Sequence, residues 1–257
     1  MRRAARHSVT AAAMWVAVFT LVASSAVVPA RGAASSNPLT NFFTRTDQPL
    51  KEYRALRRMH ASTEKATHEA WLEAWTELKN GRFSYEIVSE RGSEAVRGKV
   101  LRTMLAREAE LVNSGDGGRG ELTAANYEFS EAGRDANGTR VVKLKPRRSD
   151  PLLVDGQAVL NDGGDLVRVE GRLSKNPSFW TSLVNIVRRY ARIGGVRVPV
   201  ATETTAKVKF VGTSQLEVLY DYQSVNGRPV ALTERRSAGP VRIAERQGSS
   251  AGATAVR

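Results

Sequence analysis

The chain has 257 residues, 41% of them hydrophobic, and its 39 Lys and Arg residues against 26 Asp and Glu residues give a formal net charge of +13. It contains no cysteine, which excludes disulfide bonds, thiolate metal sites and a cysteine nucleophile. The length suits one domain with some segments outside its core, and the positive charge favours anionic partners such as lipid head groups.

Residues 1–33 have the pattern of a secretory signal peptide. Arg2, Arg3 and Arg6 precede an uncharged apolar run over residues 11–28, and small residues follow it. We therefore expect cleavage and a location in the periplasm, and export argues against nucleic acid as the anionic partner. The alternative is an uncleaved membrane anchor, because a run of this length is at the lower limit for spanning a bilayer.

Apolar spacing predicts a helical region from Pro49 to Lys79. Trp71, Trp75 and Leu78 recur at the spacing of one helix face, and Asn80-Gly81 would end the helix. One long helix or two shorter ones fit the pattern. Together with the helix expected at residues 94–112, this region would supply the N-terminal helical layer of the fold.

Strands are predicted after it, interrupted by one more helix. Residues 83–88 alternate between apolar and other residues and predict a strand, and residues 94–112 carry an apolar stripe typical of a helix. Strands are then expected at 127–129 and 138–148. Asp155-Gly156 and the stretch 161–165 both read as hairpin turns.

The clearest strand pattern runs from Leu166 to Asn226. Apolar and polar residues alternate along it, and turn residues interrupt it at 175–177, 194–195 and 212–214. This predicts four or five antiparallel strands in a meander. A last short strand is expected at 230–232. From residue 237 onward, Gly, Ser, Ala and Arg occur without a period, which predicts a disordered tail over 237–257.

Together these elements predict an α+β fold, in which a curved antiparallel sheet is covered on its concave face by N-terminal helices. The domain boundaries are a signal peptide at 1–33, a folded domain at 34–236 and the tail at 237–257.

No catalytic constellation stands out. The sequence lacks a Gly-x-Ser-x-Gly elbow, a Walker loop and a Gly-x-Gly-x-x-Gly loop. His60, Glu64 and His68 would share a helix stripe, but the two histidines would lie about 12 Å apart, too far to bind one metal ion. The aspartates between 150 and 165 fit turns better than a calcium loop. We expect a protein that is not an enzyme and uses no metal or cofactor, with a hydrolase as the weakest alternative.

The sheet offers a wide apolar face with few helices to cover it, which could leave an apolar ligand cavity, while an ordinary packed core is the plainer reading of the pattern alone. The candidate ligand-binding residues are Trp71, Trp75, Val184, Ile186, Tyr190, Val196, Val198, Leu216, Val218 and Tyr220. Arg168 and Arg172 share one strand face, and Lys207 and Lys209 share another. If these faces are continuous, the outer surface is cationic and could rest on an anionic membrane, while a solvated face is the plainer reading.

Several stretches resemble the LolA-like family of periplasmic lipoprotein-sorting proteins. They are Val196-Arg197-Val198-Pro199 and the later stretch LYDYQSVNG at 219–227, together with the export signal, the front helix and the meander. Residues 69–78 and 176–181 also resemble uncharacterised exported bacterial proteins near that superfamily. The resemblance spans residues 50–228.

The resemblance implies an open half-barrel with helices as a lid over an apolar cavity, which in that family holds lipid or the acyl chains of lipoproteins. It implies no catalytic residues. Family members that sort lipoproteins depend on a lid arginine and on membrane partners, and no residue here is matched to that arginine. We therefore expect a periplasmic carrier or binder of lipids or acyl chains. The alternative is a non-enzymatic interaction or sensor module of the cell envelope with a filled core and protein partners.

Overall fold

A computed structural model describes residues 40, 42, 48–64, 68–135, 138–179, 181–210 and 212–231. The predicted signal peptide and the predicted tail lie outside these residues. The elements in chain order are β1 Tyr53–Thr63, β2 Ala70–Lys79, β3 Arg82–Gly92, α2 Glu94–Val96, η1 Arg97–Arg102, α3 Thr103–Asn113, η2 Asp116–Gly120, β4 Tyr127–Arg134, β5 Arg140–Pro146, β6 Val154–Leu160, β7 Leu166–Leu173, β8 Thr181–Ile193, β9 Val196–Val208, β10 Gly212–Val225 and β11 Arg228–Pro229.

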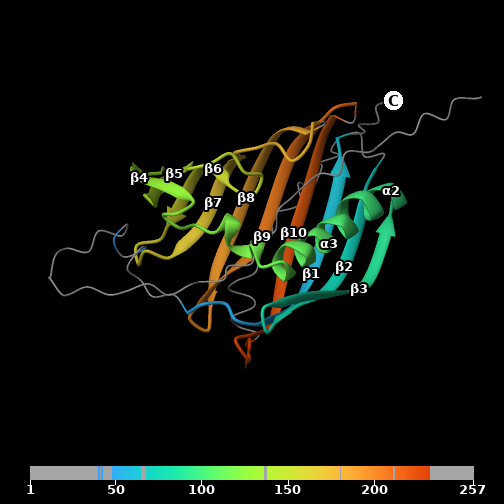
Figure 1. The fold of residues 1–257 in the computed structure, drawn as a ribbon, viewed down its shortest axis with the longest axis horizontal. Helices are drawn as coiled ribbons and strands as arrows, with labels where there is room; N and C mark the ends of the chain where they lie inside the picture. Colours follow the sequence, from blue (N-terminus) through green and yellow to red (C-terminus); the bar gives the residue numbers. More distant parts are fainter. Residues whose placement is uncertain are drawn as a thin grey trace, which may run out of the picture.

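The strands form one antiparallel sheet in the order β3-β2-β1-β10-β9-β8-β7-β6-β5-β4, with β11 paired to β10. Its first strand in sequence therefore lies beside its last long one, and β3 and β4 form the two edges. Figure 1 shows a curved, open sheet with the helical segment lying across the β1–β3 end of one face. The predicted curved antiparallel sheet is confirmed.

The predicted helix over Pro49 to Lys79 is wrong, because this region forms the β1–β2 hairpin. Residues 70–78 also satisfy a period of two, in which Ala70, Leu72, Ala74, Thr76 and Leu78 are buried and the residues between them are half-buried. This alternation is hard to recognise in the sequence, because three of the five buried positions hold two alanines and a threonine rather than large apolar residues. Pairing with β1 and β3 on either side favours the strand, since a central strand buries one face continuously.

The helix predicted at 94–112 is confirmed as the continuous segment α2–η1–α3, whose middle part is a π-helix. This segment lies against β1–β3, so one of the two predicted front helices does cover the sheet, and the β1–β2 hairpin takes the place of the other. Among the described residues, no helix is long and apolar enough to cross a membrane.

The meander predicted at 166–226 is confirmed as the four strands β7 to β10. The predicted turn at Asp155-Gly156 is wrong, because both residues lie inside β6. Gly156 pairs with Gly171 of β7. A Cβ atom at Gly156 would lie 2.1 Å from the carbonyl oxygen of Glu170. Glycine at this position therefore allows β6 and β7 to approach closely, and it does not form a hairpin turn.

Asn226 ties the segment before β1 to the end of β10. Its side-chain Nδ2 donates to the carbonyl of Pro49 at 2.8 Å, and its Oδ1 accepts from the backbone N–H of Lys51 at 2.8 Å and of Glu52 at 3.2 Å. Asn226 and Gly227 both have positive φ, at 48° and 76°, as a two-residue hairpin turn requires.

Asn226→Ala is expected to lower the free energy of unfolding by about 2–3 kcal/mol, because three hydrogen bonds and a residue tolerant of positive φ are lost. Asn80→Ala is the matched control, since Asn80 has a similar φ of 52° in the exposed β2–β3 turn, and about 1 kcal/mol is expected there. Urea denaturation measures both. Equal losses would show that the side-chain hydrogen bonds of Asn226 contribute nothing.

Asp150 joins η2 to the β5–β6 connection. Its carboxylate is 3% exposed and accepts hydrogen bonds from Leu152 N–H at 2.9 Å, Arg119 at 2.9 Å and Arg148 at 3.3 Å. Burial alone would raise the pKa of Asp150, but the hydrogen bond from Leu152 and the two arginines outweigh burial, and its pKa is lowered.

The stability that Asp150 contributes should therefore be present at neutral pH and lost in acid. Because its pKa is lower in the folded chain, the unfolded chain takes up this proton first, below about pH 4, and stability falls from there as pH drops through the folded pKa. Urea midpoints of the wild type and Asp150→Asn should be measured from about pH 6 to about pH 3, a range that spans the ordinary pKa of an aspartate. The two midpoints should converge at the acid end of this range. Parallel curves would contradict this role.

Candidate functional site

The candidate site lies between the α2–η1–α3 segment, here called the cover, and the face of the sheet that it lies on, here called the inner face. The cover begins after Gly92 of β3 and crosses back over β3, β2 and β1. Its buried side chains meet those of the three strands in one hydrophobic cluster. The cover contributes Leu101, Met104, Leu105 and Val112, and the strands contribute Met59, Leu72, Ala74, Leu78 and Phe83.

Both ends of the cover are attached at the β3 edge. At the start, Arg102 pairs with Glu90 and Glu94, and Arg97 pairs with the same two carboxylates. At the end, the Asn113 side chain accepts from Phe83 N–H at 2.8 Å and donates to Phe83 C=O at 3.1 Å. The middle of the cover is thus held mainly by what lies beneath it.

Beneath it, a buried ion pair joins the cover to the sheet. The guanidinium of Arg57 on β1 meets both oxygens of Glu108 on α3, one of them at 2.8 Å, and each side chain is 1% exposed. Arg57 also donates to the Tyr53 hydroxyl at 2.8 Å. Its guanidinium lies 4.9 Å from the ring centre of Tyr220 and 5.1 Å from that of Phe83. Bidentate geometry and stacked rings make this a strong, specific contact.

Burial acts to lower the pKa of Arg57, but the Glu108 carboxylate and the neighbouring tyrosines outweigh it and raise that pKa well above its ordinary value. Burial also raises the pKa of Tyr53, Tyr220 and Tyr222. At neutral pH the Arg57 guanidinium is therefore charged and the three phenols are neutral.

The inner face is not the uniformly apolar wall that the sequence predicts. Arg188 on β8 is 6% exposed, and its Nε donates to Thr202 of β9 at 3.4 Å. Together with Arg57 it places two cations on an otherwise hydrophobic surface. One row of directly paired residues crosses the inner face from strand to strand. From β5 to β2, this row consists of Val142, Ala158, Val169, Arg188, Thr202, Val218, Met59 and Leu72.

Most of the predicted ligand-binding residues lie in the hydrophobic cluster. Val184, Ile186, Leu216, Val218 and Tyr220 are at most 6% exposed and lie on the inner face. Tyr190 is half-buried further along β8. Val196 and Val198 are also fully buried, at the start of β9 beyond the bulge that faces Arg189 and Tyr190.

Trp71 and Trp75 lie on β2 and point away from the cover. The ring of Trp71 stacks on His60 at 4.8 Å, and Arg91 lies 4.1 Å from its centre on a neighbouring strand. Trp75 lies under Arg54 at 4.8 Å. A pocket of about 510 Å³ opens beside Trp71 on this outer face. Its wall includes Arg58, His60, Glu73, Ser89, Arg91 and Glu217. The prediction that both tryptophans lie on a helix over the inner face is therefore wrong.

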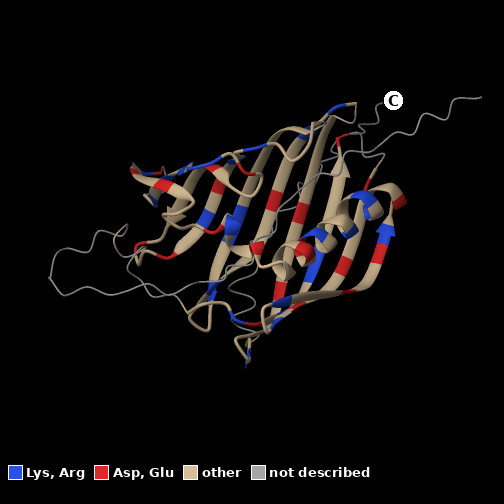
Figure 2. Cartoon of the chain, viewed as in Figure 1, with Lys and Arg blue, Asp and Glu red and all other residues tan. Residues whose placement is uncertain are grey.

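The outer sheet surface carries both signs of charge rather than a continuous cationic band. Arg168 pairs with Glu170, Arg189 with Glu203 and Arg192 with Asp165. Figure 2 shows basic and acidic bands mixed along these strands.

Sequence reasoning missed Arg57 and Glu108. A signal for Glu108 was present, because it lies four residues after Met104 and seven after Leu101, on the apolar stripe of the helix. A charge on such a stripe needs a buried partner. Within the described part of the chain, no cluster of three His, Asp or Glu side chains could hold a metal ion.

No protein-family model matches the sequence, and no curated protein matches it either. Among solved structures, the chain is similar to an outer membrane lipoprotein-sorting protein domain from Vibrio parahaemolyticus, with 8% identity over 78% of this chain and 95% of that one and a TM-score of 0.40. It is also similar to a DUF1329 family protein from Desulfovibrio piger, with 11% identity over 71% and 88% of the two chains and a TM-score of 0.30.

Proposed function

We propose that this protein is a non-enzymatic carrier of the cell envelope that holds a lipid or acyl chain on the inner face of the sheet, beneath the cover. The observation that carries the proposal is the construction of the cover. It buries the apolar side chains of β1–β3, and the buried Arg57–Glu108 ion pair joins it to the sheet.

Lifting the cover exposes a hydrophobic strip on β1–β3, including Met59, Leu72 and Leu78. An acyl chain can replace the side chains that the cover withdraws. Each buried CH₂ contributes about 0.8 kcal/mol, so a chain of about 16 carbons offsets the several kcal/mol lost when the cover leaves. A π-helix within the cover marks where its backbone departs from regular hydrogen bonding, and such turns occur frequently at functional sites.

Arg57 gives the site a preference for an anionic amphiphile. When Glu108 moves away with α3, the guanidinium keeps its charge in an apolar environment and needs another anion. A carboxylate or phosphate accepts the same bidentate pair of hydrogen bonds. The head group of the ligand therefore takes the place of Glu108, and its chain takes the place of the apolar side of α3.

In its finer form the proposal is a periplasmic role in handling lipoprotein acyl chains, as the resemblance of residues 196–199 and 219–227 to LolA-like proteins implies. Support for the location comes from the sequence of residues 1–33, with its basic start, apolar run and small residues.

Uptake of a fluorescent fatty acid by the chain without residues 1–33 tests the proposal, together with native mass spectrometry after gentle extraction from cells. Leu105→Trp should weaken uptake about tenfold or more, because the larger ring would occupy the volume that the ligand chain takes when the cover lifts. Leu56→Trp is the matched control on the outward face of β1, where the side chain is half-buried, and should leave uptake unchanged. A protein that is always ligand-free and takes up no fatty acid would overturn the proposal.

A second candidate is an interaction module of the envelope with a permanently filled core. The observation that favours it is the packing beneath the cover, where Leu72 and Leu105 are 0% exposed and Met59 is 2% exposed. Cross-linking in cells that captures protein partners and no lipid would support this function instead.

A further inference from the structure

One end of the sheet presents apolar side chains to solvent. Phe210, in the β9–β10 connection, is 95% exposed, and Phe179, in the β7–β8 connection, is 78% exposed. Leu183, at the start of β8, is 36% exposed. These are three of the five large hydrophobic side chains that are exposed among the described residues, and the other two, Val88 and Val167, lie on strands elsewhere.

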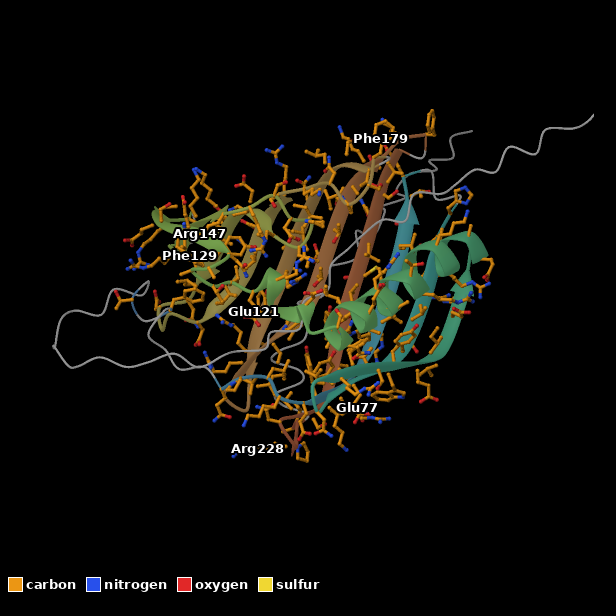
Figure 3. All side chains as sticks on the ribbon, viewed as in Figure 1. Glu77, Glu121, Phe129, Arg147, Phe179 and Arg228 are labelled. Atoms are coloured by element: carbon orange, nitrogen blue, oxygen red, sulfur yellow. The ribbon has the colours of Figure 1, made fainter. Side chains whose placement is uncertain are left out.

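Strand register brings the two connections together. Thr181 pairs with Val208, so the residues just before β8 and just after β9 lie at the same end of the sheet. The Nζ atom of Lys209 lies 3.8 Å from the ring centre of Phe179, which links one connection directly to the other. Figure 3 shows Phe179 at the margin of the molecule, beyond the strand ends.

Backbone conformation at this end is unusual. Among the described residues, four that are not glycine have positive φ. Asn80 and Asn226 are residues that tolerate this region, but Leu183 at 55° and Phe210 at 67° are bulky and strained there. Strain of this kind is kept where the side chain serves a function rather than stability.

The charge here is positive. Residues 171–189 and 204–216 contain no Asp or Glu, and they supply Lys175, Lys207 and Lys209 to the same end. The neighbouring β1–β2 turn contributes Glu64, whose backbone N–H donates to Thr213 C=O at 2.8 Å and whose carboxylate accepts from Thr213 N–H at 3.4 Å. Exposed aromatic side chains on a lysine-containing end of the sheet match the interface of a membrane that contains anionic lipids.

We propose that Phe179, Leu183, Phe210, Lys207 and Lys209, here called the tip, dock this protein on an anionic lipid surface. The rings enter the boundary between head groups and acyl chains, and the lysines contact lipid phosphates. The tip lies at the ends of β8 and β9, whereas the cover packs on β1–β3, so the proposal does not depend on ligand binding beneath the cover.

Co-sedimentation with vesicles tests this proposal on the chain without residues 1–33. The vesicles are phosphatidylcholine alone, or phosphatidylcholine with about 30% phosphatidylglycerol to supply the anionic surface potential. The wild type should bind the anionic vesicles, and binding should weaken with added salt because the lysines are screened. Phe210→Asn should weaken partitioning about tenfold or more, because one buried ring is lost. Lys207→Gln with Lys209→Gln should weaken it by a similar factor and reduce its dependence on salt.

Phe210→Asn separates docking from folding, because asparagine tolerates the left-handed region and should keep or raise the melting temperature. Val88→Ser removes an exposed apolar side chain from β3 and should bind vesicles like the wild type. No binding of the wild type to anionic vesicles, or equal binding by Phe210→Asn, would overturn the proposal. Self-association in sedimentation velocity that Phe210→Asn abolishes would also overturn it, by assigning the tip to a second copy of the chain. Fatty acid uptake, measured separately, reports on the cover alone.

Discussion

Glu108→Gln is expected to lower the free energy of unfolding by about 3–5 kcal/mol, because it leaves the Arg57 guanidinium buried without a counter-charge. Both partners are 1% exposed, so water cannot replace the lost anion. Glu110→Gln is the matched control on the same helix, since the Glu110–Arg107 pair is 65% and 50% exposed, and less than about 0.5 kcal/mol is expected there. Urea denaturation of the two variants measures the difference.

The double variant Arg57→Met with Glu108→Leu should recover most of that loss, because a buried ion pair is often replaced by apolar side chains of similar volume without cost. Its ligand binding should not recover, since no cation remains for the head group of an anionic amphiphile. Recovery of both stability and fatty acid affinity would show that the ion pair only supports the fold. Equal losses for Glu108→Gln and Glu110→Gln would show that the buried contact carries little stability.

Gly92→Ala is expected to cost about 3 kcal/mol or more, which combines a left-handed backbone penalty with a steric clash. Gly92 has a φ of 88°, and a Cβ atom there would lie 2.3 Å from the Glu69 carbonyl oxygen and 2.8 Å from Ala70 Cα. Both neighbours are backbone atoms that cannot move without breaking the β2–β3 ladder. Ser93 N–H donates to the same Glu69 carbonyl at 2.8 Å, so the start of the cover shifts as well.

Gly81→Ala provides the control for the backbone term alone. Gly81 has a φ of 72°, and nothing lies within 4 Å of its Cβ position, so only about 1–2 kcal/mol is expected. Hydrogen exchange of the α3 amides should rise in Gly92→Ala and stay unchanged in Gly81→Ala. Similar exchange in both variants would show that Gly92 does not hold the start of the cover.

The C-terminal part of the sheet was largely predictable from the sequence, whereas its N-terminal part was not. The meander over β7 to β10 follows from alternation and from turn residues, because a strand with one buried face needs both. Residues 70–78 fit two periods at once, since Trp71, Trp75 and Leu78 match a helix face while Leu72 and Ala74 match a strand face. The choice between them depended on pairing with β1 and β3, which a local pattern does not contain.

The candidate site was predictable only in its apolar half. Residues such as Val184, Ile186 and Val218 reach the inner face because of strand alternation, which the sequence shows. Arg57 and Glu108 are 51 residues apart, and each resembles an ordinary surface charge in its own segment. Their contact exists only because the chain turns after β3 and brings α3 back over β1, and that turn is a property of the whole topology.

Methionine methyl NMR tests the central claim, that a lipid chain binds between the cover and the inner face, most directly. The chain without residues 1–33 contains two methionines, Met59 on β1 and Met104 on α3, which are 2% and 5% exposed and belong to the same cluster. Titration of ¹³C-methyl-labelled protein with a long-chain fatty acid should shift both resonances and give contacts from both methyl groups to the ligand chain. Saturable fatty acid binding that leaves both methyl resonances unchanged would contradict the claim.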